Sequence, residues 1–148
     1  MRLTQARAPE YSVAAAGMKD TTANWLASAD YDLETAGAML RSRRYLYVVF
    51  MCHLALEKTL KAICAEIHGE RPPRSHDLLF LVRRLELAVP KTHLEFIGVI
   101  NNASIPTRYP EDLKRIVSQY PRTTAISYLS KTKRAITWLG KSSRLTGQ

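Results

Sequence analysis

Two lysines and a glutamate lie close together in the stretch ALEKTLKA. Glu57 and Lys61 are four residues apart, so on a helix their side chains can pair across one turn. Together with Lys58 they offer ammonium groups that can bind phosphate. The alternative is an ordinary surface ion pair, which contributes roughly 0.3–0.5 kcal/mol to helix stability. On the first interpretation, Lys58 and Lys61 are predicted to bind a ligand.

A histidine, an arginine and a tyrosine are the other candidate groups. His76 lies in Ser75-His76-Asp77, at an expected helix start, where free N–H groups favour an anion. Arg108 has a planar guanidinium suited to phosphate, and the ring of Tyr109 can stack on a base. The alternatives are a helix cap, a surface arginine and a core tyrosine. The predicted ligand-binding residues are Lys58, Lys61, His76, Arg108 and Tyr109.

Motifs of the common nucleotide-binding and hydrolytic enzymes are absent from the sequence. It contains no GxxxxGKS/T phosphate loop, no GxGxxG, no GxSxG and no HExxH. The four histidines do not combine with carboxylates or thiols at spacings that bind a metal. We therefore expect neither a metal site nor a cofactor.

The chain is strongly basic, and its charge is unevenly distributed. Its 148 residues include 22 Lys and Arg against 13 Asp and Glu, a formal charge of +9. Residues 20–40 hold four acids and no base, whereas residues 131–144 hold five bases and no acid. Both runs can be solvated helix faces, or the basic end can meet phosphates or an acidic protein. The excess favours a nucleic acid, a nucleotide or an acidic protein as partner.

Length and composition indicate one globular domain. No stretch approaches the roughly 18 uninterrupted apolar residues of a transmembrane helix, so we expect no membrane association. The only cysteines, Cys52 and Cys64, lie in apolar helical contexts and do not indicate a disulfide framework. We therefore expect a cytoplasmic protein.

Apolar periodicity predicts helices throughout the body of the chain. The first helix is capped by Asp20 or Thr21 and runs to about residue 41. The second spans about 45–68 and ends at Gly69. Because its first half is apolar nearly all round, it forms either the centre of a bundle or the seam of a dimer.

Four further segments follow. A third helix is capped by Ser75 and stops at Val89-Pro90, and a fourth runs from Lys91 or Thr92 to about residue 103. The stretch NNASIPTRYPED is predicted to be irregular, with a short helical piece at 112–119. Pro121 is predicted at the first position of a last helix. The inward stripe of that helix is Ile126, Leu129, Lys133, Ile136 and Leu139-Gly140.

These elements predict an all-α fold, an antiparallel up-and-down bundle of about five helices. Residues 1–18 lack periodicity and are predicted to form a flexible N-terminal arm, of which 1–17 is an extension that the fold does not need. Residues 19–141 form the bundle, and residues 142–148 form a C-terminal tail.

Four segments in order carry a resemblance to a known family. They are WLASADYDL, ALEKTLKA, RSHDLLFL and TRYPED. Together they resemble the HEPN (higher eukaryotes and prokaryotes nucleotide-binding) domain family, small stand-alone type, over about residues 19–140. No single segment is specific, but their order and separation in an all-helical chain are.

The resemblance implies an all-α bundle that is usually dimeric. It also implies a minimal nucleotidyltransferase as partner, with this chain as the substrate-binding half or as one component of a toxin–antitoxin pair. Some branches of the family are metal-independent ribonucleases with an Arg-x4–6-His motif near the start of a late helix. Here only Arg71 and His76 match that spacing, in the Pro-containing loop before the third helix, and we interpret the match as fortuitous.

Three functions remain open at this point. The leading prediction is a homodimeric module that binds a nucleotide or another phosphate-bearing ligand beside a nucleotidyltransferase. The alternative is a ribonuclease toxin that acts on RNA, with Arg71 and His76 as its candidate catalytic residues. The third is an interaction protein whose basic last helix docks an acidic partner. Whether the chain is an enzyme is left open by the sequence.

Overall fold

In the computed structural model, which describes residues 17–69, 71–143 and 145, the chain folds into six α-helices. The described residues contain no strand, so the all-α prediction is confirmed, with one helix more than expected. The helices are α1 (Asp20–Arg41), α2 (Tyr45–His68), α3 (Leu78–Leu85), α4 (Lys91–Arg108), α5 (Leu113–Ser118) and α6 (Arg122–Ser142).

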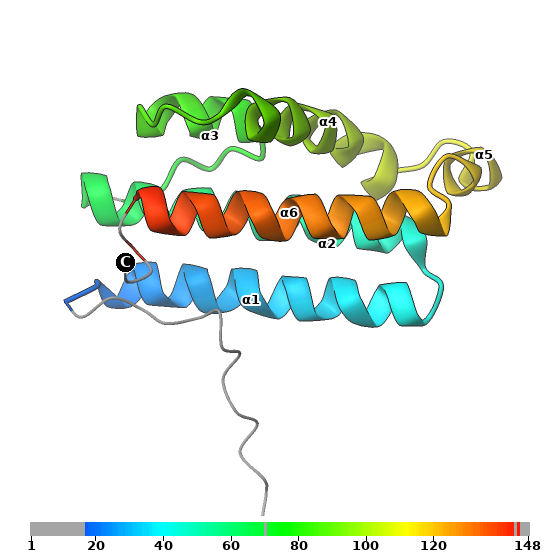
Figure 1. The fold of residues 1–148 in the computed structure, drawn as a ribbon, viewed down its shortest axis with the longest axis horizontal. Coiled ribbons are helices and arrows are strands. Elements are labelled where there is room, and N and C mark those ends of the chain that lie inside the picture. Colours follow the sequence, from blue (N-terminus) through cyan, green and yellow to red (C-terminus); the bar gives the residue numbers. More distant parts are fainter. Residues whose placement is uncertain (1–16, 70, 144, 146–148) are drawn as a thin grey trace, which may run out of the picture.

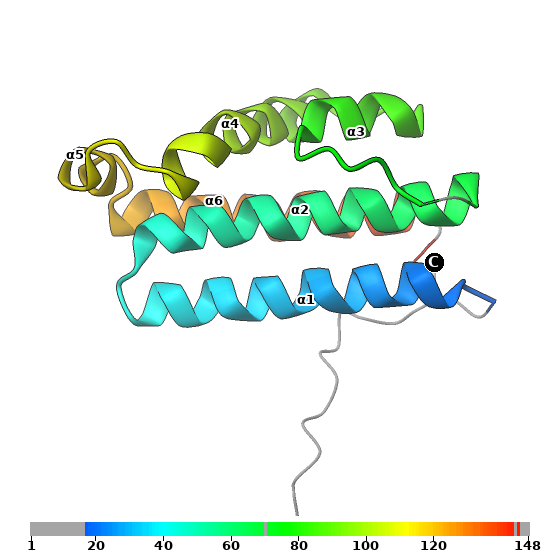
Figure 2. The same ribbon diagram turned by 180° about the vertical axis from the view of Figure 1, so that it is seen from behind.

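The helices form three layers. In Figure 1, α1 lies below, α2 and α6 lie in the middle, and α3 with α4 lies above; Figure 2 shows the same order from behind. Helices α2 and α6 run in one direction, and α1 and α4 run in the other. Helix α5 lies at the end of the bundle where α1 turns into α2.

Helix α2 is the centre of the bundle. It packs against α1, α3, α4 and α6, which explains why its first half is apolar on every side. Gly69, with φ of 67°, ends it as predicted. A glutamate and a lysine, Glu57 and Lys61, are nevertheless buried within this helix. A buried charge must be paired, and these two residues pair with each other. Because burying charges is costly, this pair is a candidate functional position as well as a part of the core.

Two helix starts differ from the prediction. Helix α1 has Lys19, not Asp20 or Thr21, at its N-cap position and has no side-chain cap, since a lysine side chain carries no acceptor. Within its first turn the hydroxyl of Thr22 donates to Glu66 of α2 at 2.6 Å. Helix α3 is capped by Asp77 rather than Ser75 and begins later than expected. The Asp77 carboxylate accepts from the N–H groups of Leu79 and Phe80, which lowers the pKa of Asp77.

The prediction of an irregular segment after residue 103 is partly wrong, since α4 continues through Pro106 to Arg108. A proline in a helix removes one hydrogen bond, here to the carbonyl of Asn102. Asn102 is exposed, so that carbonyl can be hydrated. The hydroxyl of Thr107 donates to Ala103 at 2.7 Å and adds a contact at the same turn.

The predicted stripe of α6 is confirmed at Leu129 and Leu139-Gly140, which are buried, and is displaced by one residue at its other positions. Ile126 and Lys133 are exposed, whereas Ala125, Thr132 and Ala135 are buried. These buried side chains are small, which allows α6 to approach α2 closely. The large apolar residue at 126 is left at the surface.

The chain ends contribute two contacts to the core. Met18 packs partly buried against it, and Leu145, in the segment predicted as a tail, is buried. Residues 1–16 of the predicted arm lie outside the described residues. Within the described part of the chain, no helix combines the length and apolarity needed to cross a bilayer.

Candidate functional site

Lys58 lies in an ion pair between two helices. Its ammonium group lies 2.7 Å from a carboxylate oxygen of Asp32 and links α2 to α1. Asp32, one of the four acids of residues 20–40, is buried and so does not belong to a solvated helix face. Because Lys58 neutralises a buried carboxylate, it stabilises the packing of the two helices.

Glu57 connects two of the predicted site residues. One of its carboxylate oxygens accepts from Lys61 Nζ at 3.3 Å, and the other lies 2.8 Å from Nδ1 of His76. Glu57 and Lys61 are both buried, whereas the side chain of His76 is 62% exposed. The carboxylate therefore orients the imidazole through Nδ1, so that Nε2 is left to face solvent.

A second histidine fixes the backbone at this point. Nε2 of His53, which is buried in α2, donates to the carbonyl oxygen of His76 at 3.1 Å. Burial lowers the pKa of His53, and the guanidinium of Arg108 lowers it further, against the opposing effect of Glu57. His53 is therefore neutral, with the proton on Nε2, and it anchors the segment that carries His76.

Arg108 is close enough to His53 to lower its pKa, and so approaches the Glu57 cluster from the side of His53, whereas Tyr109 lies apart from that cluster. The guanidinium of Arg108 lies 5.0 Å from the ring centroid of Phe50, an interaction with the first half of α2. Tyr109 is 71% exposed and lines a hollow between α4 and α5. Among the described residues, no contact joins either side chain to Lys61 or His76.

A cationic pocket lies beside the Glu57 cluster. It has a volume of about 550 Å³ and lies between α1, the end of α2 and the loop that follows. Among the described residues, no carboxylate lines it. The charged and aromatic side chains in its wall are Lys19, Trp25, Lys61, Arg71 and Arg74.

Lys61 is the buried cation of this pocket. Its ammonium group lies 5.7 Å from the ring centroid of Trp25 and donates to Glu57. An ammonium group has three N–H donors, and the contacts of Lys61 with the described residues use one of them in a hydrogen bond. Arg71 and Arg74 are exposed at the rim. The arrangement can hold an anion between a buried ammonium and two guanidinium groups.

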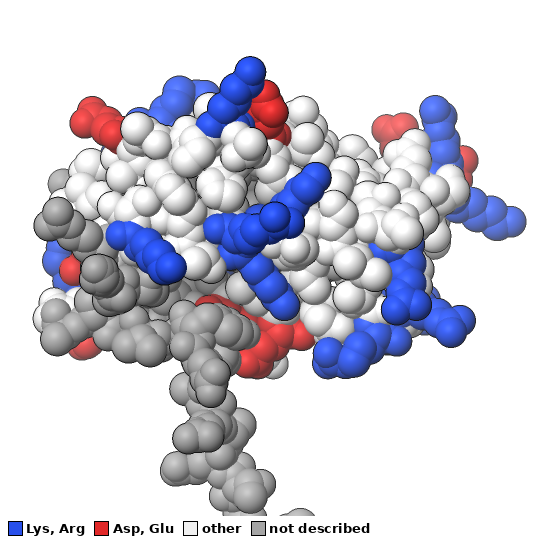
Figure 3. All heavy atoms as spheres, viewed as in Figure 1, with Lys and Arg blue, Asp and Glu red and all other residues white. Residues whose placement is uncertain are grey.

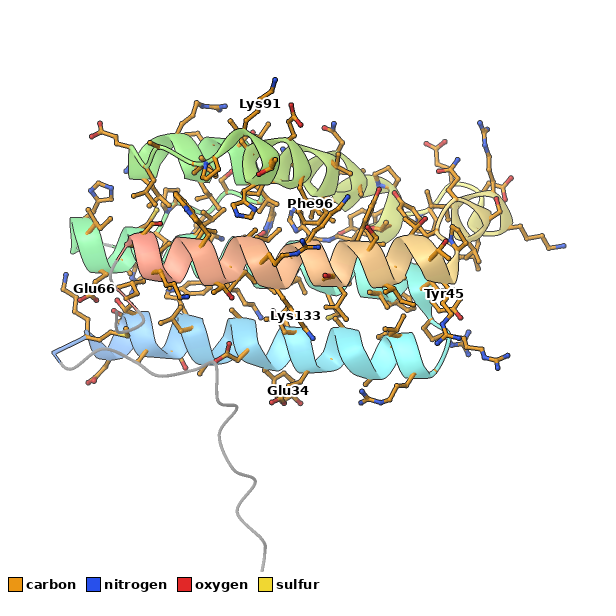
Figure 4. The ribbon with its side chains drawn as sticks, viewed as in Figure 1. Glu34, Tyr45, Glu66, Lys91, Phe96 and Lys133 are labelled. Atoms are coloured by element: carbon orange, nitrogen blue, oxygen red, sulfur yellow. The ribbon has the colours of Figure 1, made fainter. Side chains whose placement is uncertain are left out.

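A groove of about 610 Å³ separates α4 from α6 on the other side of the bundle. Its walls include Lys131 and Arg134, and Figure 3 shows basic side chains gathered over the middle of α6. Phe96 lies between α4 and α6 in Figure 4, with its ring edge-on to Tyr128. Glu95 also lines the groove, so its charge is mixed.

Three charged or aromatic residues of the cationic pocket, Lys19, Trp25 and Arg74, were not among the predicted site residues. The ring of Trp25 is half-buried and faces Lys61. Arg74 was quoted only as part of a motif. The sequence feature that could have indicated this pocket is a pair of arginines on either side of Pro72-Pro73, directly after a helix. No cluster of three or more potential metal ligands occurs among the described residues.

The comparisons with known proteins agree with this architecture. Two solved structures are similar to this chain. TT1696 from Thermus thermophilus has a TM-score of 0.71 and 23% sequence identity, and the match covers 84% of this chain and 99% of TT1696. ST0689, an archaeal HEPN homologue, has a TM-score of 0.67 and 21% sequence identity, and the match covers 82% of this chain and 97% of ST0689. No curated protein matches. The model of the HEPN domain matches residues 22–142, so this chain belongs to the HEPN domain family.

Proposed function

We propose that this protein binds a phosphate-bearing ligand, such as a nucleotide, in the cationic pocket. The observation that carries the proposal is the buried ammonium group of Lys61 with spare N–H donors at the wall of a pocket free of carboxylates among its described residues. Because Glu57 already pairs with Lys61, the net positive charge that attracts a phosphate comes from Lys19, Arg71 and Arg74, and Lys61 contributes hydrogen-bond donors.

Each side chain of the pocket has a distinct role in this proposal. Lys61, Arg71 and Arg74 bind phosphate oxygens, and the half-buried ring of Trp25 bounds or stacks on the rest of the ligand. His76, whose Nδ1 donates to Glu57, lies two residues after Arg74 and follows the pocket along the chain. Lys58, Arg108 and Tyr109 remain predictions outside this pocket.

The cellular setting is proposed from family membership. The chain would act beside a minimal nucleotidyltransferase, as its substrate-binding half or as a toxin–antitoxin component, and would form a homodimer. Two buried free cysteines suit a reducing, cytoplasmic compartment. Co-purification from the native host, followed by identification of the bound protein and any retained nucleotide, tests this setting.

Calorimetric titration with ATP and with inorganic phosphate tests the pocket itself. Replacing Arg71 and Arg74 by alanine is expected to weaken ATP binding about tenfold or more, since two charge-assisted hydrogen bonds are lost. The matched control replaces Lys131 and Arg134 by alanine, which removes the same charge from the α4–α6 groove and should leave affinity unchanged. Equal losses in both variants would show that net charge alone holds the nucleotide.

The Glu57–His76 pair favours a second candidate function, cleavage of RNA. His76 Nε2 would accept the proton of a 2′-OH, whose oxygen attacks phosphorus while the bond to the 5′-oxygen breaks and that oxygen takes a proton from water. Arg71 would stabilise the charge that develops on phosphorus. If His76→Ala and Arg71→Ala leave a measured RNA cleavage rate intact, this pair is not the active site.

A further inference from the structure

Helix α5 and the end of α4 expose an apolar ledge. Four large apolar side chains recur every fourth residue there: Ile105, Tyr109, Leu113 and Val117, which are 73%, 71%, 58% and 46% exposed. None of the residues of α5 is buried, although the helix lies against α2. We call these four residues the α4–α5 ledge.

This exposure is unusual for a free surface. A helix of six residues is too short to be stable by itself and normally depends on burying an apolar face. Here Asp112 caps the helix, and no other part of the described chain covers its outer apolar residues. Single exposed apolar residues are ordinary, but four large ones within 13 residues at one end of a bundle are typical of an interaction surface.

A hollow of about 390 Å³ adjoins the α4–α5 ledge. Ile105 and Tyr109 of the ledge line it with Pro106 and Ile116, whereas Leu113 and Val117 do not, and Glu111, Asp112 and Arg115 also lie in its wall. A hollow of this size can accept an apolar side chain from another molecule. A partner with a projecting apolar residue therefore fits it better than a flat surface does.

Basic residues surround the ledge. The turn between α1 and α2, helix α5 and the start of α6 all lie at this end of the bundle in Figures 1 and 2. Lys and Arg atoms also dominate this end in Figure 3, on the right. The exposed cations of these three segments are Arg41, Arg43, Arg44, Lys114, Arg115 and Arg122.

We infer that the α4–α5 ledge docks a partner protein through an amphipathic helix with acidic flanks. The apolar side chains of that helix would cover Ile105, Tyr109, Leu113 and Val117, and its carboxylates would meet the surrounding cations. A second copy of this chain is disfavoured, because the same cations would face one another. An anionic membrane is disfavoured by the hollow, which a flat bilayer surface does not fill.

The test uses the full chain and two labelled helical peptides. Both carry leucines at positions i, i+3 and i+7, but one has glutamates and the other lysines at each end. Fluorescence anisotropy is expected to show tighter binding of the glutamate peptide, weakened by salt. Replacing Leu113 and Val117 by aspartate should reduce its affinity about tenfold or more. The control Tyr31→Asp changes an equally exposed ring on α1 and should have no effect.

A second variant tests the charges without touching α5. Replacing Arg41 and Arg44 by glutamate should weaken binding of the glutamate peptide and strengthen binding of the lysine peptide. Equal affinity of both peptides for the wild-type protein would overturn the inference. So would a wild-type dimer that the Leu113 and Val117 variant converts to monomer, or ledge-dependent binding to phosphatidylserine vesicles.

Discussion

Nδ1 of His76 lies 2.8 Å from a carboxylate oxygen of Glu57, and the two residues come from different parts of the fold. Glu57 is buried in the central helix α2, whereas His76 lies in the loop before α3. The other carboxylate oxygen binds the buried ammonium of Lys61. One carboxylate thus neutralises the cation beside the pocket and orients the imidazole near its rim.

Replacing Glu57 by glutamine is expected to destabilise the fold by about 3 kcal/mol, because Lys61 is then buried without a counter-charge. Urea unfolding monitored by circular dichroism measures this loss. His76→Ala removes the exposed partner of the same carboxylate and should cost much less. Similar losses in both variants would contradict the assignment of Glu57 as the counter-ion of Lys61.

The stability of the protein is expected to fall as the pH drops below about 6.5. Burial lowers the pKa of His53, so between its folded and unfolded values the unfolded chain binds more protons. Folding is then disfavoured progressively until the pH falls through the lowered pKa of the folded state. Thermal unfolding between about pH 7 and pH 5.5 measures the slope.

The His53→Gln variant is the control for this titration. Its amide can still donate to the carbonyl of His76 but does not titrate. The variant should show a shallower loss of stability than the wild type over the same pH range. Parallel curves for the two proteins would assign the pH dependence to other groups.

The thiol of Cys52 is expected to be inert in the folded protein. Burial is the main cause that raises the pKa of Cys52 to about 11, and the side chain is inaccessible. Iodoacetamide at about pH 8 should therefore modify Cys52 only after denaturation, as mass spectrometry of digests can show. Rapid labelling of the native protein at Cys52 would indicate that α2 opens locally.

Replacing Glu86 by glycine is expected to stabilise the protein by about 0.5–1 kcal/mol, because its backbone is strained. Glu86 follows the last residue of α3 with φ of 53°, in the left-handed region that glycine adopts without strain. Chemical denaturation measures the gain. The control Glu86→Ala also removes the charge but keeps the β-carbon, so it should give no gain in the free energy of unfolding. A difference between the two variants therefore reports the relief of backbone strain.

Much of the helical framework follows from local sequence. The bounds of α2 and its end at Gly69 follow from apolar residues and a C-terminal glycine, which act within a few residues of each other. The Glu57–Lys61 pair was likewise predictable, because four-residue spacing brings side chains together on any helix. The cap at Asp77 was one choice among neighbouring polar residues, and the structure selected it by its two backbone hydrogen bonds.

Only the tertiary structure decided which of these groups share a site. No spacing rule brings His76 onto Glu57 or places Trp25 opposite Lys61, because both contacts depend on how a loop and a second helix pack against α2. The same holds for Tyr109, which the packing leaves exposed on the ledge. The sequence by itself determined an all-α chain of the HEPN family with an ion pair on its second helix. Packing between distant segments decided that this pair is buried beside a pocket, since contacts between such segments have no fixed period along the chain.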